Sequence, residues 1–120
     1  MLPAKLRFPF RKYPDFFQQS RWGVVPGAKN DPLLRSLSFR VQQKDDSGLR
    51  WAIVTSKKVG NAVVRAQNKR FVRQAIIELS REDASVFALP YNVVVYLRSS
   101  LSSTEEAKQI ITQFLRTIIA

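Results

Sequence analysis

The chain has 120 residues, 45% of them hydrophobic, which is enough for one compact core. We therefore expect residues 1–120 to form a single domain. The 20 Lys and Arg against 9 Asp and Glu give a formal net charge of +11, which indicates a polyanionic partner. The chain has no Cys and no His, which excludes disulfides, thiolate nucleophiles and the side chain best suited to proton transfer near neutral pH.

The N-terminal part of the chain favours short elements joined by turns. Residues 1–12 alternate basic and aromatic side chains and contain two prolines, so we expect an extended arm. Pro14 and Asp15 suit the first turn of a short helix that ends before Gly23. Residues 26–32, PGAKNDP, have the turn chemistry of a loop.

Two strands are predicted next. Residues 37–42 alternate apolar and polar side chains, so one side of this strand should be buried and the other, which carries Arg40 and Gln42, should face water. The turn sequence QKDDSG leads into a second strand at residues 49–56. This pattern predicts that the two strands form a hairpin.

The most basic stretch is SKKVGNAVVRAQNKRFVR, residues 56–73. Its 18 residues hold six of the 20 Lys and Arg and no acid. Gly60 suits a tight turn, and Asn61 suits the N-cap of a helix that runs to about Ser80.

This helix is predicted to have one cationic face and one apolar face. Arg65, Lys69 and Arg73 follow one another at intervals of four residues and therefore share a face, which is suited to gripping phosphate groups. The opposite side carries an apolar stripe that can dock on a sheet: Val64, Phe71, Val72, Ala75 and Leu79.

The C-terminal third predicts a strand and a helix. Residues 93–97, VVVYL, are apolar on both faces, as in a central strand. The last helix begins at SSTEE, where Ser103 and Glu106 fit a capping box. Its broad apolar face consists of Ala107, Ile110, Ile111, Phe114, Leu115 and Ile118.

Nothing in the sequence predicts a membrane span or export. The chain has no run of about 18 apolar residues, and its basic N-terminus lacks the apolar core and cleavage site of a secretory signal. We therefore expect a cytoplasmic location.

The stretch SKKVGNAVVRAQNKRFVRQ, residues 56–74, resembles the signature of the bacterial ribonuclease P protein subunit family. The order of the predicted elements is similar to that family from about Arg11 to the C-terminus. The resemblance implies an α+β fold, an α/β sandwich with a three- to four-stranded mixed sheet and about three helices, similar to the second domain of ribosomal protein S5. It also implies a left-handed βαβ crossover, an exception to the general right-handed rule.

The family resemblance also implies a function. Ribonuclease P removes the 5′ leader from precursor tRNA, and its RNA subunit carries the active site with magnesium ions that activate water and stabilise the leaving oxygen. The implied partners are the catalytic RNA and precursor tRNA, with no further protein required. No catalytic residue and no metal ligand is assigned to the protein, and magnesium is expected to be held mainly by the RNA. The sequence leaves open whether the protein itself orders a metal ion, given Ala66 and Gln67.

Carried over position by position, six cations match the family's basic motif. The resemblance implies that they contact phosphates of the catalytic RNA: Lys57, Lys58, Arg65, Lys69, Arg70 and Arg73. A solvated helix face is the alternative, which the absence of acids in this stretch disfavours. Asn61 either contacts RNA or serves only as the N-cap.

Four residues are candidates for contact with the leader. Phe16 lies where the family has an aromatic residue in the leader cleft, so it is either a stacking partner for an unpaired leader or a core aromatic. Arg11 and Lys12 flank the same path, and Arg40 is a further candidate on the polar side of its strand.

The chain departs from the family pattern inside the basic motif. The family usually reads Arg-Asn-Arg before the Lys-Arg pair, whereas this chain has Arg65, Ala66 and Gln67. A contact that depends on the missing Asn and Arg is therefore not expected. Asn68 replaces a common aliphatic residue and should lie at the edge of the core, and Gln74 replaces a common glutamate.

Two other functions are alternatives to this principal hypothesis. A structural RNA-binding protein of the ribosomal type would use a similar fold without a role in processing, and it would co-purify with ribosomal subunits. A protein-only nuclease is disfavoured by the lack of His and of clustered acids.

Overall fold

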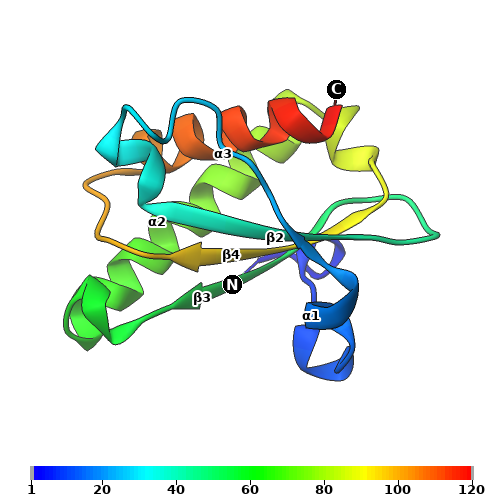
Figure 1. Ribbon diagram of the computed structural model, residues 1–120, viewed down its shortest axis with the longest axis horizontal. Coiled ribbons are helices and arrows are strands. Elements are labelled where there is room, and N and C mark those ends of the chain that lie inside the picture. Colours follow the sequence, from blue (N-terminus) through cyan, green and yellow to red (C-terminus); the bar gives the residue numbers. More distant parts are fainter. Residues whose placement is uncertain (1, 120) are drawn as a thin grey trace.

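Four strands form one open sheet in the order β1-β2-β4-β3 (Figure 1). They are β1 (Arg21–Trp22), β2 (Leu37–Gln43), β3 (Arg50–Thr55) and β4 (Tyr91–Leu97). β2 runs antiparallel to both of its neighbours, whereas β3 runs parallel to β4, so the sheet is mixed. The computed structural model describes residues 2–119.

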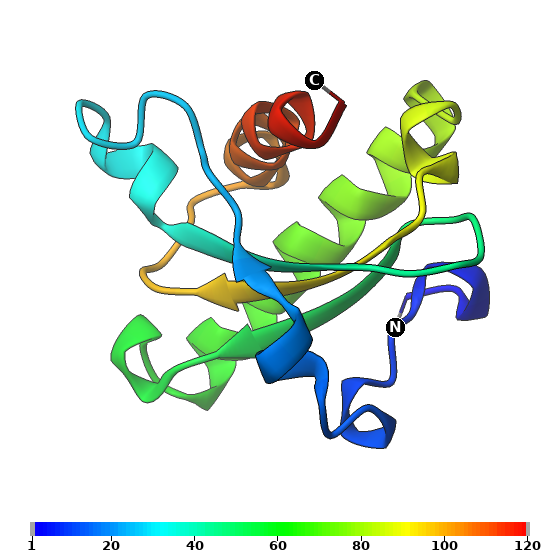
Figure 2. The same cartoon turned by 45° about the vertical axis from the view of Figure 1, so that its right-hand side comes forward.

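Three helices lie on the two faces of this sheet. α2 (Ala62–Glu82) and α3 (Thr104–Ile119) cover one face, and α1 (Phe16–Gln19) lies on the other together with the N-terminal segment (Figures 1 and 2). Short 3-10 turns connect these elements: η1 (Ala4–Leu6), η2 (Phe10–Lys12), η3 (Pro32–Arg35), η4 (Lys57–Val59) and η5 (Val86–Ala88). No helix in residues 2–119 combines the length and the hydropathy needed to cross a membrane.

The predicted α+β fold with a mixed sheet and three helices is confirmed. The parallel strands β3 and β4 are joined through α2. Figure 1 shows α2 behind these strands, with both strands pointing left and β4 above β3. The β3–α2–β4 crossover is therefore left-handed.

The predicted hairpin between β2 and β3 is wrong, because β4 lies between them. Val93, Val94 and Val95 of β4 have no exposed surface, so the strand that is apolar on both faces takes the central place. The connection after β2 pairs with the chain that leads into β4. The amide of Lys44 donates to Pro90 O at 3.0 Å, and that of Leu49 donates to Phe87 O at 2.8 Å.

The N-terminal segment is not the extended arm that the sequence predicts. Residue 1 lies outside the described part, but Leu2, Leu6 and Phe8 are buried. The Phe8 amide donates to the carbonyl oxygen of Trp51 at 2.8 Å, which fixes the segment beside β3. Its apolar side chains therefore join the core instead of remaining in water.

The polar side of β2 is also less exposed than predicted. Gln42 is only 8% exposed because α1 and β4 lie beside it. Its Nε2 donates to Gln19 Oε1 at 2.7 Å, and its Oε1 accepts from Asn92 Nδ2 at 3.1 Å. These bonds satisfy the buried amide and connect α1 to the sheet.

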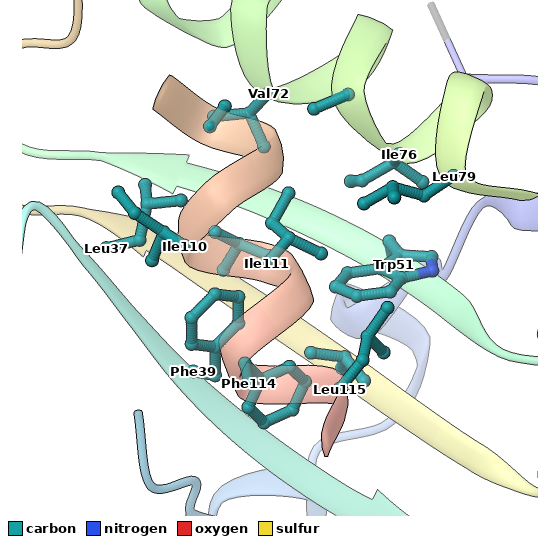
Figure 3. Packing of buried hydrophobic residues seen from close by; sticks show 14 of the residues in the cluster. Leu37, Phe39, Trp51, Val72, Ile76, Leu79, Ile110, Ile111, Phe114 and Leu115 are labelled. Atoms are coloured by element: carbon teal, nitrogen blue, oxygen red, sulfur yellow. The ribbon is translucent and has the colours of Figure 1, made fainter. Parts of the chain in front are cut away.

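The main core lies between the sheet and the pair α2 and α3 (Figure 3). All six residues of the predicted apolar face of α3 are buried. The rings of Phe39 and Phe114 stack with centroids 4.1 Å apart, and the amide of Gly23, directly after β1, donates to Phe39 O at 2.8 Å. A Cβ at Gly23 would lie 2.5 Å from Cε1 of Phe114, so this position requires glycine.

The start of α2 agrees with the sequence prediction. The Asn61 side chain accepts a hydrogen bond from the Val64 amide at 3.0 Å, which confirms the N-cap. Gly60 has a φ of 149°, a region that favours glycine. The helix extends two residues beyond the predicted end, to Glu82.

Hydrogen bonds and ion pairs connect α2 to α3 and to the loop before it. Asn68 is buried rather than at the core edge, where it donates to Val64 O and accepts from the Leu101 amide. Lys108 of α3 lies 3.3 Å from Glu78 and 3.1 Å from Glu82. The Gln74 side chain donates to Glu78, and this bond, followed by the one from Lys108, lowers the pKa of the Glu78 carboxyl.

Replacing Phe114 with Ala should lower the free energy of unfolding by about 3–5 kcal/mol, because truncating a fully buried ring leaves a cavity. Phe71→Ala should cost less, since that ring is only partly buried. Urea unfolding of the two variants measures the difference. Equal losses at both positions would contradict this packing.

Candidate nucleic-acid interface

The cationic ridge, Arg65, Lys69 and Arg73, lies on the side of α2 that faces the outer edge of β3. The three side chains are half-buried, and they border the same hollow as Thr55 at the end of β3. Partial burial of their stems limits the motion of the charged groups, which lie in one row along the helix. The predicted shared face is therefore present.

Three further cations of the motif are exposed. Lys57 and Lys58 belong to η4, directly before the helix, and Arg70 lies beside the ridge on α2. Within residues 2–119, no carboxylate forms an ion pair with these three residues or with the ridge. The positive charge of this surface is therefore not neutralised by the described part of the chain, as a phosphate-binding surface requires.

A second group of side chains lies on the opposite face of the sheet. This aromatic–cationic cluster consists of Phe17, Trp22, Arg40, Tyr96 and Arg98. The guanidinium carbons of Arg40 and Arg98 lie 4.9 Å and 5.4 Å from the centroid of the Trp22 ring. The rings of Trp22 and Tyr96 are 5.5 Å apart. Trp22 is 50% exposed, so the cluster offers both stacking surface and positive charge to solvent.

The hydrogen bonds of the cluster fix its two arginines. Arg40 donates to Ser20 Oγ at 2.9 Å and to the carbonyl oxygen of Phe17 at 2.8 Å, so it connects β2 to α1 and to the residue that follows it. Arg98 donates to Ser38 Oγ at 3.2 Å. Burial raises the pKa of the Tyr96 phenol despite the opposing charges of the two arginines, so the hydroxyl is protonated at neutral pH.

The predicted leader residues do not gather at one place. Phe16 has no exposed surface and packs with Phe8 and Val94, so the core interpretation is correct and its ring is not available for stacking. Arg11 and Lys12 are exposed in η2. Lys12 borders a hollow with Arg50 at the start of β3, whereas Arg40 lies in β2.

Sequence reasoning missed Phe17, Trp22, Tyr96 and Arg98. Pairing explains why they meet, because β2 aligns Arg40 with Trp22 of β1 and Ser38 with Tyr96 of β4. The alternation in β4 places Tyr96 on the same face as Val94, but only the strand order brings that face next to Arg40. The two-residue strand β1 is too short to give a periodic signal.

The described residues show no preformed cluster of metal-ligating side chains. Residues 2–119 contain no group of three or more His, Cys, Asp or Glu side chains close enough to share an ion. Magnesium prefers oxygen ligands, with carboxylates as its usual protein ligands.

A sequence model of the family described as Ribonuclease P matches residues 28–119. The chain belongs to the ribonuclease P protein family. The matched region contains the basic motif, the ridge and all of the sheet except β1. Both the cationic surface and most of the aromatic–cationic cluster therefore lie within the family region.

Curated relatives support this assignment over part of the chain. The ribonuclease P protein component of Bacillus cereus strain B4264 is 47% identical over 62 residues, which cover 52% of this chain and 54% of the relative. That of Bacillus anthracis strain A0248 is 41% identical over 59 residues, which cover 49% and 50%. The chain spans about half the length of the curated relatives it matches.

Solved structures show the same fold over nearly the whole chain. The RNase P protein of Staphylococcus aureus superimposes with a TM-score of 0.66 at 18% identity, covering 97% of this chain and 96% of that one. The RNase P protein of Thermotoga maritima gives a TM-score of 0.56 at 18% identity, covering 93% and 86%. At these identities the likeness supports the fold alone.

Proposed function

We propose that this protein is the protein subunit of ribonuclease P, and that it promotes removal of the 5′ leader from precursor tRNA by a catalytic RNA. The observation that carries this proposal is the set of six cations without an ion-pair partner in residues 2–119, on and directly before α2, within the family's basic motif. Because the chain has no His and no Cys, a division of labour with an RNA catalyst suits its composition.

The cationic ridge with Lys57, Lys58 and Arg70 is the surface proposed to bind the catalytic RNA. Its charges are held at a helix face that is anchored in the core through Val72 and Ile76. A fixed row of cations meets successive phosphates with little loss of side-chain entropy. Contact of Asn61 with RNA stays a prediction, since its side-chain oxygen already caps α2.

The aromatic–cationic cluster is the surface proposed to bind the leader. Unpaired nucleotides are recognised by stacking on aromatic rings and by charge along the backbone, and Trp22 with Arg40 and Arg98 offers both. In this proposal Phe16 supports the site from the core, and Arg11 and Lys12 extend the positive charge beyond it. The leader and the catalytic RNA are then bound on different faces of the protein.

Magnesium enters the proposal as an ion held mainly by the RNA. Such ions supply activated water and stabilise the leaving oxygen in phosphodiester hydrolysis. The protein contributes positive charge and orientation, which lower the magnesium concentration that the assembled RNA needs.

Reconstitution with the cognate catalytic RNA tests the proposed function. Adding the protein should increase cleavage of precursor tRNA at low magnesium, because its cations replace part of the counterion charge around the RNA. The rate of appearance of the mature 5′ end measures this effect. A cleavage rate that does not increase at any protein concentration would contradict the proposal. Co-purification of the protein with ribosomal subunits would favour a structural RNA-binding role instead.

Replacing Arg65, Lys69 and Arg73 together with Ala should weaken binding to the catalytic RNA. The slope of log affinity against log salt should fall by roughly 2 to 3, since each lost phosphate contact releases fewer counterions. Filter binding across a salt series measures both quantities.

A control variant loses three positive charges at positions outside the ridge. Lys29, Arg35 and Arg116 are exposed on the loop before β2 and on α3, and their triple Ala variant should keep the wild-type slope. Equal slopes for the two triple variants would mean that only net charge matters and that the ridge has no specific role.

Replacing Trp22 with Ala should reduce the preference of the assembled complex for precursor tRNA over mature tRNA. The expected loss is about 1–3 kcal/mol if one leader base stacks on the ring. Binding of both tRNAs by gel shift measures the preference, with Arg116→Ala as a control on another surface. A variant that keeps the full preference would exclude Trp22 from the leader path.

A further inference from the structure

A groove runs between the outer edge of β3 and the cationic ridge. It consists of two hollows that share Lys69 and Arg73, so they form one continuous depression. The first hollow adds Arg65 and lies near the end of β3. The second is bordered by Ile53 of β3 and extends under the N-terminal segment.

The N-terminal segment forms the far wall of this groove and contributes Arg7 to it. The backbone of Arg7 pairs with Trp51 in a parallel bridge, and the following amide, that of Phe8, donates to Trp51 O at 2.8 Å. Buried Leu6 and Phe8 anchor the chain on both sides of Arg7, whose own side chain is exposed. Arg7 is therefore held at the groove by the fold of the segment.

The charge of the groove selects an anionic occupant. Its borders carry four cations, Arg7, Arg65, Lys69 and Arg73, and no Asp or Glu. Apolar side chains such as Ile53 lie between the two cationic sides. Phosphates beside the cations and sugars over the apolar floor match this arrangement, as in grooves that follow a nucleic-acid backbone.

An acidic peptide added to the β3 edge fits less well. The bridge of Arg7 with Trp51 already occupies the first part of that edge, and β3 ends at Thr55. The remaining residues 53–55 are too few for a stable added strand, which relies on a row of main-chain hydrogen bonds.

We propose that the groove between β3 and α2 binds a stretch of RNA backbone, and that Arg7 and the cationic ridge hold this strand from opposite sides. This inference rests on the proposed function, because the RNA in question is the catalytic RNA. The N-terminal segment then contributes Arg7 to the surface that binds catalytic RNA, whereas Arg11 and Lys12 of the same segment are candidates for contact with the leader.

The test is direct binding of Arg7→Gln to the cognate catalytic RNA without any tRNA, so that leader contacts do not contribute. The affinity should fall several-fold, and the slope of log affinity against log salt should fall by roughly 0.7–0.9, the value for one lost phosphate contact. Thermal unfolding of Arg7→Gln is measured beside binding, so that a loss of affinity counts only if the variant is folded at the assay temperature.

Two variants control for net charge and for side-chain shape. Lys5→Gln makes the same charge change in the same segment, but Lys5 borders a different hollow, so this variant should bind like the wild type. Arg7→Lys should retain most of the affinity because it keeps the charge. If Arg7→Gln binds like Lys5→Gln, the groove proposal is overturned while the proposed function stands. If the wild-type protein itself does not bind the catalytic RNA, the result contradicts the proposed function and not only the groove proposal.

Discussion

The burial of β4 on both faces is the constraint on which the rest of the structure depends. Val93 and Val95 pack under α2 and α3, whereas Val94 packs with Phe8 and Phe16 on the other face. Because β4 occupies the centre, β3 becomes an edge strand whose outer side faces the ridge of α2. The same placement brings Tyr96 beside Trp22. Both candidate binding surfaces therefore follow from the position of one strand.

The two candidate binding surfaces combine positive charge with different neighbouring side chains. The cation–π contacts found in residues 2–119 involve Arg40 and Arg98 and not the ridge of α2, whose row of charges suits the phosphates of a folded RNA. On the opposite face Arg40 and Arg98 accompany rings, which suits an unpaired strand. The sheet between them keeps the two sites apart, so one ligand does not compete with the other for the same side chains.

Local patterns predicted the elements well, and non-local pairing explains most of the errors. The Asn61 cap, the ridge and the apolar face of α3 could be predicted because each depends on residues within a few turns of one helix. The hairpin failed because the choice between β3 and β4 as the neighbour of β2 depends on burial of residues about 50 positions away. The same reason explains why Gln42 is buried, contrary to the prediction, and why the sequence allows two interpretations of Phe16, since their burial depends on α1 and the N-terminal segment.

The central position of β4 also determines when the chain can fold during synthesis. β2 and β3 share no ladder of their own, and residues 91–97 must reach the gap between them before the sheet exists. A nascent chain that has emerged only as far as α2 has no strand to join its two sheet fragments. The basic helix α2 is therefore synthesised before the sheet on which it docks is complete. It takes up its fixed position only after β4 has been made and has joined the sheet.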